Sequence, residues 1–122
     1  MVKALFDTNI LIDHLNSVPA ARAELGRYRD RAVSMITWIE VLVGAKPGVE
    51  AATRNFLDEH FHVIGLDEQM AERVVELRKL HRVKLPDAII WACAQVHAML
   101  LVTRNTKKLP CGDPSIRMPY RI

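Results

Sequence analysis

Four short polar segments of this 122-residue chain carry the residues best suited to metal or acid–base chemistry. They centre on Asp7, Glu40, Asp87 and Asn105, and each lies beside apolar sequence that is expected to be buried. An unpaired carboxylate in such a place is costly unless a cation compensates its charge. A shared divalent metal is the simplest such cation. Because carboxylate oxygens suit Mg²⁺ and Mn²⁺, the sequence predicts a hard-cation site.

A metal held by Asp7, Glu40 and Asp87 could lower the pKa of a bound water and neutralise charge on a phosphoryl transition state. Without metal, three clustered carboxylates would repel one another, so at least one of their pKa values should rise. Each acid also has an ordinary structural interpretation. Asp7 could be a turn residue, and Glu40 could form a capping box with Thr37. Asp87 could be an acid of the first helical turn that interacts favourably with the helix dipole. Together, beside a basic half of the chain, they favour a nuclease.

That basic half lies towards the C-terminus. Residues 1–77 carry 8 Lys/Arg against 12 Asp/Glu, whereas residues 78–122 carry 9 against 2. The overall net charge of +3 therefore conceals segments of −4 and +7. Such an asymmetry suggests a polyanionic partner, RNA or DNA, although a solvated charged surface is the plain alternative. Phosphate contacts carry no sequence information, so charge does not distinguish RNA from DNA.

Length and composition indicate one soluble domain spanning residues 1–122. A chain of this size buries about two thirds of its unfolded surface, and therefore needs neither a disulfide nor a metal to fold. No apolar run is long enough to span a bilayer, and the N-terminus lacks the pattern of a signal peptide. We expect a cytoplasmic protein that does not enter membranes, with Cys93 and Cys111 as free thiols.

Short apolar runs and helical patterns alternate along the chain. Strands are predicted at Val2–Phe6, Ala32–Ile36, His62–Gly65 and Met99–Val102, with an edge strand at Ile116–Tyr120. Predicted helices run from a cap at Thr8 or Asn9 to Leu15, then over Pro19–Arg29, Trp38–Ala45 and Val49–His60. Thr37 is the predicted cap of the third of these. Asp67 is predicted to cap a long amphipathic helix in which Met70, Val74, Leu77 and His81 recur at helical spacing, and Pro86 to start a central buried helix.

Strands separated by helices predict an α/β fold with a parallel central sheet of four or five strands. Ligands of such sheets gather at the carboxyl ends of the strands. Asp7 ends the first predicted strand, and Thr103 to Asn105 follow the fourth. Glu40 and Asp87 belong to helices that start near the same edge. We therefore expect these side chains to share one crevice.

The same segments resemble a known family. The residues Phe-Asp-Thr-Asn-Ile-Leu-Ile-Asp at 6–13, Thr-Trp-Ile-Glu at 37–40, Leu-Pro-Asp-Ala-Ile-Ile-Trp-Ala at 85–92 and Val-Thr-Arg-Asn-Thr at 102–106 are similar to those of PIN domains. More narrowly, the chain resembles the VapC-type toxins of bacterial toxin–antitoxin pairs. The resemblance implies a Mg²⁺- or Mn²⁺-dependent endoribonuclease that acts on RNA, forms a homodimer and is inhibited by a cognate antitoxin.

Residue roles follow from the matching motifs. Asp7, Glu40 and Asp87 would be metal ligands, with Asn105 as a further catalytic residue. Asn9 and Thr103 would support the site, and Arg104 would contact RNA phosphate or an antitoxin acid.

One position departs from the family. Relatives commonly place an acid where this chain has Lys108. Lys108 could bind the scissile phosphate, weaken metal binding or mark reduced activity. A catalytically weak or silent PIN-like protein that binds RNA or antitoxin is therefore the main alternative. A phosphoacceptor domain that uses Asp7 fits less well, because no acidic pair precedes that residue.

Overall fold

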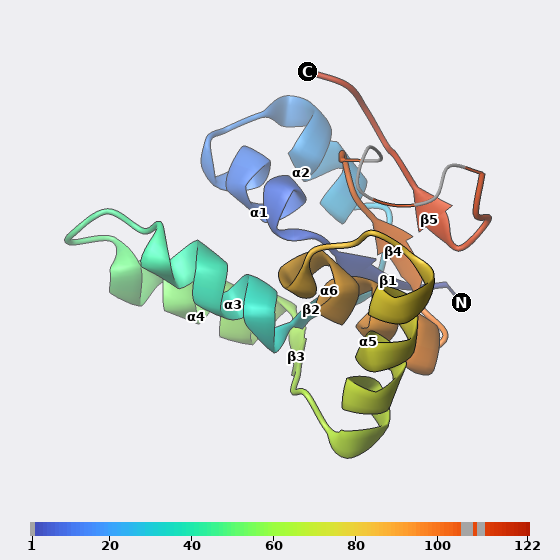
Figure 1. Cartoon of the computed structure of the whole chain (residues 1–122). Coiled ribbons are helices and arrows are strands. Elements are labelled where there is room, and N and C mark those ends of the chain that lie inside the picture. The colour runs from blue at the N-terminus through green and yellow to red at the C-terminus, as the bar shows by residue number, and fades with distance from the viewer. Residues whose placement is uncertain (1, 106–108, 110–111) are drawn as a thin grey trace.

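The computed structural model describes residues 2–105, 109 and 112–122 (Figure 1). The elements follow in the order β1 Lys3–Phe6, α1 Thr8–Leu15, α2 Pro19–Leu25, β2 Asp30–Ser34, α3 Met35–Val43, α4 Glu50–His60, β3 His62–Ile64, α5 Glu68–Leu80, α6 Leu85–Val96, β4 Leu100–Val102 and β5 Ile116–Arg117. This alternation confirms the α/β class predicted from the sequence.

The five strands form one sheet in the order β3-β2-β1-β4-β5, and every neighbouring pair is parallel. The chain first builds outward from β1 to β3 and then crosses back to place β4 on the other side of β1. The strand order therefore reverses at β1, where Phe6 pairs with Val102 of β4. In open parallel sheets, the crevice beyond the carboxyl ends at such a reversal is the usual ligand site.

Alternation of side chains along the strands builds a separate core on each face of the sheet. Leu5 of β1 packs into the core formed with α5 and α6. Its neighbours Ala4 and Phe6 face the opposite core, which contains residues of α1, α2, α3 and α4. Figure 1 shows α5 and α6 together on one side of the sheet and α1 and α2 on the other. The central strand β1 is thus covered on both faces, which holds its carboxyl end in place.

The long helix α5 matches the sequence-based prediction closely. Asp67 is its N-cap, and the Asp67 side chain accepts a hydrogen bond of 2.9 Å from the backbone N–H of Met70. Met70, Val74 and Leu77 are its buried residues, as their helical spacing predicted, whereas His81, the fourth residue of that spacing, is the exposed C-cap. The outward face of α5 is mainly polar but also exposes Val75 and Leu80. The buried face of α5 therefore follows from amphipathic periodicity.

The predicted start of the third helix was wrong. Strand β2 ends at Ser34 rather than Ile36, and Ser34, not Thr37, is the N-cap of α3, accepting a hydrogen bond from Ile36 N–H at 3.3 Å. Thr37 is fully buried inside the helix. Because Glu40 then lies beyond the first turn, a capping box does not account for it.

Other boundaries also differ. The helix predicted over Pro19–Arg29 ends at Leu25, where Gly26 caps it, and β2 begins already at Asp30. Asp7, rather than Thr8 or Asn9, caps α1. The edge strand predicted over Ile116–Tyr120 covers Ile116–Arg117. Beyond it, the Tyr120 hydroxyl donates to Asp13 of α1 at 2.7 Å, a tertiary contact that strand propensity does not report.

Within the described part of the chain, no helix is both long and apolar enough to cross a membrane. Cys93 is a free, buried thiol, and burial raises its pKa to about 12. The predictions for Cys111 and Lys108 lie outside the described residues.

Candidate active site

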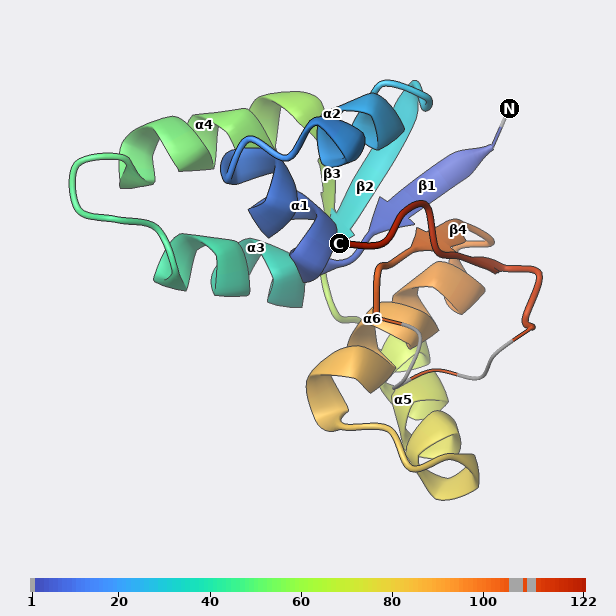
Figure 2. The ribbon, with the colours of Figure 1, turned by 90° about the horizontal axis from the view of Figure 1, so that it is seen from above.

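Asp7 stands at the carboxyl end of β1, at the point where the strand order reverses. Figure 2 shows β1 and β2 running towards the starts of α1 and α3, so that the edge of the sheet meets both helices. The backbone N–H of Asp7 donates to the carbonyl of Val102 at 2.9 Å, which extends the pairing of β1 with β4 by one residue. The side chain of Asp7 is 7 % exposed. A rigid sheet therefore presents a nearly buried carboxylate.

Three donors hold this carboxylate in one orientation. Oδ1 of Asp7 accepts a 2.7 Å hydrogen bond from the backbone N–H of Thr8. Oδ2 accepts one from Thr103 Oγ1 at 2.8 Å and a longer one from Asn9 Nδ2 at 3.4 Å. Thr103 is fully buried at the end of β4. The structure thus brings both predicted supporting residues, Asn9 and Thr103, to Asp7.

The pKa of Asp7 is raised above its ordinary value. Desolvation by burial is the largest cause, and the negative charges of Asp87 and Glu40 add to it. The hydrogen bonds from Thr103 and Thr8 act in the opposite direction but do not outweigh burial. Two further acids therefore lie within electrostatic reach of Asp7.

Glu40 comes to this site from the exposed side of α3. Its Oε1 accepts a 2.8 Å hydrogen bond from the Thr8 hydroxyl, which also lies 3.0 Å from Thr37 Oγ1. Thr8 thereby links Asp7, through its backbone, with Glu40, through its side chain. Sequence reasoning gave Thr8 and Thr37 helix-capping roles and missed this bridge. The signal available was that both residues lie in the same polar motifs as the acids.

Asp87 and Asn105 complete the predicted set from two other elements. Asp87 is half-buried in the first turn of α6, and its charge acts on Asp7. Asn105 follows β4, and its backbone N–H donates to Thr103 Oγ1 at 3.1 Å. The acids thus come from β1, α3 and α6, which are far apart in sequence.

Arg104 is held by a carboxylate that the sequence analysis did not single out. Its Nε and Nη2 donate to the two oxygens of Asp13 at 2.8 and 3.2 Å, and Tyr120 Oη donates to Asp13 Oδ2 at 2.7 Å. The backbone N–H of Arg104 donates to Asn9 Oδ1 at 3.2 Å. The ion pair therefore holds the segment after β4 against α1. Contact of Arg104 with RNA or antitoxin stays a prediction.

The donor chemistry of the site suits a divalent cation. Asp7 is a desolvated carboxylate whose pKa is raised partly by Glu40 and Asp87, an excess of negative charge that a cation would relieve. Within residues 2–105, 109 and 112–122, no three His, Cys, Asp or Glu side chains are already close enough together to hold a metal by themselves. Mg²⁺ commonly uses one or two carboxylates, with waters and substrate oxygens completing its shell. The residues present fit that mode.

These features define an α/β domain with an acidic site at the reversal of a parallel sheet. The chain matches the PIN domain family over residues 4–109, and it belongs to that family. This confirms the resemblance inferred from the four motifs. A comparison with curated proteins found no match.

Solved structures show the same relationship. The chain is 47 % identical to one in a toxin–antitoxin complex from Klebsiella pneumoniae, with 98 % of this chain and 100 % of that chain covered and a TM-score of 0.92. It is 25 % identical to a chain of DNA-bound VapBC from Salmonella typhimurium, with 88 % and 90 % covered and a TM-score of 0.72. FitAcB from Neisseria gonorrhoeae shares the fold, at 21 % identity, coverage of 98 % and 99 %, and a TM-score of 0.81.

Proposed function

We propose that this protein is a Mg²⁺- or Mn²⁺-dependent endoribonuclease and the toxin of a toxin–antitoxin pair. The observation that carries the proposal is the convergence of Asp7, Glu40 and Asp87 at the carboxyl edge of the sheet, with Asp7 nearly buried and its pKa raised. A fold does not need such an arrangement, because burying a carboxylate such as that of Asp7 costs stability. Its presence at the usual ligand position of the fold favours catalysis.

In this proposal the chain's own residues hold and orient the reacting groups. Asp7, Glu40 and Asp87 hold the cation, while Thr103 and the Thr8 N–H keep the Asp7 carboxylate in a single orientation. The Thr8 hydroxyl does the same for Glu40.

The fourth segment completes the catalytic set. Asn105, next along the chain from the Asp13-bound Arg104, would place its amide against the substrate. When bound, the cation would lower the pKa of a water and stabilise negative charge on the phosphate.

The partners follow from the relatives. One structure similar to this chain is described as a toxin–antitoxin complex, and another as DNA-bound VapBC. We propose that a cognate antitoxin covers the acidic site of this chain, and that the chain forms a homodimer or a hetero-oligomer with it. Any contact with DNA would then be a property of the complex with the antitoxin, not of this chain alone.

Cleavage of a panel of tRNAs and structured RNAs, with Mg²⁺, Mn²⁺ or EDTA, tests the activity. We expect metal-dependent cuts that disappear in Asp7→Asn, since the cation would lose its central ligand. Asp30→Asn is the matched control, because Asp30 is an exposed acid at the start of β2, at the other end of the sheet. Metal-dependent activity that persists in pure Asp7→Asn protein would refute the assigned site.

A catalytically weak or silent protein is the second candidate, favoured by Lys108 at a position where relatives commonly carry an acid. If that substitution weakens metal binding, Lys108→Asp should tighten Mn²⁺ binding in calorimetry. Lys107→Asp is the neighbouring control, with the same change of charge. Equal Mn²⁺ affinity in wild type and Lys108→Asp would remove the reason for proposing a weak or silent protein.

A further inference from the structure

The end of α5 and the loop that leads to α6 form the most basic short segment of the chain. Residues 78–84, here called the basic loop, contain Arg78, Lys79, Arg82 and Lys84 and no acid. All four cations are exposed. Such clustering on one loop is the electrostatic pattern of a polyanion-binding surface.

Within the part of the chain that the structure describes, these four cations are not paired with acids. Among the described residues, the ion pairs of Arg27, Arg54, Arg73, Arg104 and Arg117 join each of them to a Glu or Asp side chain. No ion pair of the described residues involves a cation of the basic loop. Their charge is therefore available to a ligand.

The loop is also held in a defined shape. Arg78 Nε donates to the carbonyl of Val83 at 3.2 Å, and Val83 is buried in the core beneath. The ring of His81 lies 5.1 Å from that of Trp91 of α6. The basic loop borders an open hollow of about 400 Å³, which is lined by Arg78, His81, Arg82, Val83 and Lys84. A preordered surface loses less entropy when it binds.

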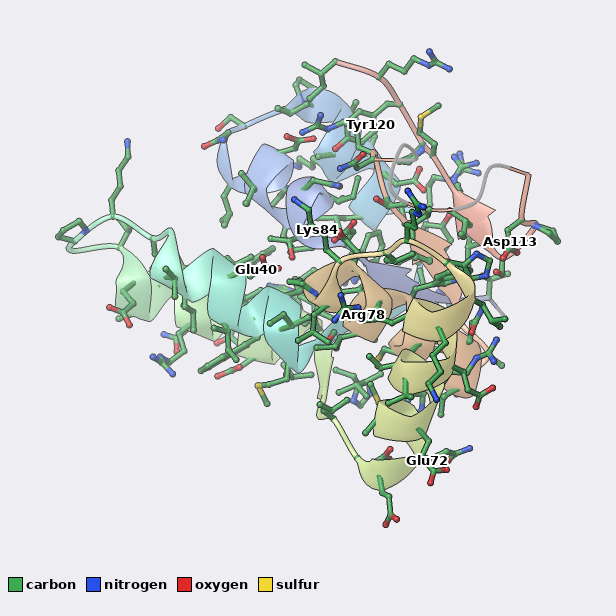
Figure 3. The ribbon with its side chains drawn as sticks, in the orientation of Figure 1. Glu40, Glu72, Arg78, Lys84, Asp113 and Tyr120 are labelled. Carbon is green, nitrogen blue, oxygen red and sulfur yellow. The ribbon has the colours of Figure 1, made fainter. Side chains whose placement is uncertain are left out.

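The basic loop leads directly into the acidic site. Lys84 is the N-cap of α6, and Asp87 lies in the first turn of that helix. The charge of Asp87 in turn acts on Asp7. In the view of Figure 3, Lys84 lies above Glu40 and Arg78. A chain of phosphates that reaches Asp7 past the start of α6 would therefore pass over these cations.

We propose that the basic loop binds the backbone phosphates of RNA next to the bond that is cut, with Arg82 and Lys84 as the principal contacts. The inference rests on the proposed ribonuclease function and adds the surface that holds the substrate. Repeated cations along an open hollow suit a polymer of phosphates better than a single anion. Such contacts position the RNA without reading its sequence.

The test measures RNA binding in the Asp7→Asn background, where cleavage does not interfere. Fluorescence anisotropy with a labelled mixed-sequence single-stranded RNA and a labelled tRNA gives affinity as a function of salt. The double substitution Arg82→Ala and Lys84→Ala should weaken binding about tenfold or more, and reduce the slope of log affinity against log salt by about one to two. Neither side chain makes a hydrogen bond that supports the described fold, so unfolding midpoints should stay unchanged.

Lys3→Ala with Lys46→Ala is the matched control. It removes the same charge from the start of β1 and from the loop after α3, both outside the basic loop. We expect its RNA affinity to fall less than twofold. Equal losses in the two double variants would show a general charge effect and overturn the proposal. Undetectable RNA binding by the Asp7→Asn protein would overturn it as well.

Cleavage by the wild-type protein, measured beside these binding assays, separates the two proposals. Metal-dependent cleavage by the wild type, with RNA binding unchanged by Arg82→Ala and Lys84→Ala, would remove the basic loop but keep the nuclease. No cleavage by the wild type, with RNA binding weakened by the double substitution, would keep the RNA-binding surface but remove the nuclease. Loss of affinity for a polyglutamate peptide, with RNA binding intact, would assign the basic loop to an acidic protein and overturn the RNA proposal.

Discussion

Two carboxylates of this protein are almost equally inaccessible to solvent, yet their pKa values are shifted in opposite directions. Asp7 is 7 % exposed and Glu24 is 4 % exposed. Burial alone would raise the pKa of both. The pKa of Asp7 is raised, whereas that of Glu24 is lowered, because hydrogen bonds from Arg117 and Tyr28 and the charges of Arg117 and Arg27 outweigh desolvation. The partners of Glu24 therefore outweigh its desolvation, whereas the donors to Asp7 do not.

The partners of Glu24 belong to the fold. Arg117 Nε and Nη2 donate to its two oxygens at 2.8 and 3.2 Å, and Tyr28 Oη donates at 3.0 Å. Asp13 has the same arrangement with Arg104 and Tyr120. For both Glu24 and Asp13, an arginine thus balances the negative charge and a tyrosine hydroxyl donates a further hydrogen bond.

Asp7 instead has neutral donors and two acidic neighbours. The comparison teaches that this fold can satisfy a buried acid with an arginine, and that the donors it gives Asp7 are uncharged.

The largest expected effect is on the structural side of the comparison. Glu24→Ala would leave the Arg117 guanidinium and the Tyr28 hydroxyl without their acceptor, and should lower the free energy of unfolding by about 3 kcal/mol. Urea denaturation measures it. Glu72→Ala, an exposed acid of α5, should change stability by less than about 0.5 kcal/mol. Similar stabilities of the two variants would contradict the interpretation.

The same variant has a defined pH dependence. Because the pKa of folded Glu24 lies below its ordinary value of 4.5, its contribution is complete above that value and is lost as the pH falls through the lowered pKa. The stability gap between wild type and Glu24→Ala should therefore shrink in acid.

Binding of Mn²⁺ tests the Asp7 side of the comparison. If Asp7 lacks a cation that the metal supplies, Mn²⁺ should stabilise the wild-type protein, by about 2.7 kcal/mol at a hundred times its dissociation constant. The melting temperature with and without Mn²⁺ measures this. Asp7→Asn should lose most of the shift, whereas Asp30→Asn should keep it. An equal shift in Asp7→Asn would place the metal elsewhere.

A smaller effect is expected from Tyr120→Phe, which removes one hydrogen bond to Asp13 and leaves the Arg104 ion pair intact. Stability should fall by about 1 kcal/mol. Tyr28→Phe removes the corresponding bond to Glu24 and should behave alike. Mn²⁺ affinity, measured by calorimetry, should stay unchanged in both variants, since neither hydroxyl touches Asp7. A large loss of Mn²⁺ affinity would mean that these clusters position the site.

The smallest expected effect is the pH dependence of Asp7→Asn without metal. The raised pKa of Asp7 means that its contribution to stability is highest below the ordinary value of 3.8 and declines as the pH rises through the folded pKa. The melting temperature of Asp7→Asn, relative to wild type, should therefore be higher at pH 7 than at pH 4. The opposite trend would show that Asp7 is already neutralised.

Much of this protein could be predicted from local sequence. Amphipathic spacing predicted the buried face of α5, and short apolar runs predicted the strands, because burial imposes the period of each element. The acids were singled out because each interrupts or borders an apolar run. Boundaries were predicted less well: Ser34 and Thr37 are both good capping residues, and packing of α3 decided between them.

By itself, the sequence determined the α/β class, the candidate acids and the uneven distribution of charge. It did not determine which charges meet. Asp13 and Arg104 are 91 residues apart. The sequence around each of them is equally compatible with a side chain exposed to solvent. The tertiary structure decided that Asp13 and Glu24 pair with arginines, whereas no arginine of the described residues pairs with Asp7. The physical reason is that a pKa depends on distances between groups, which only the packed sheet and helices establish.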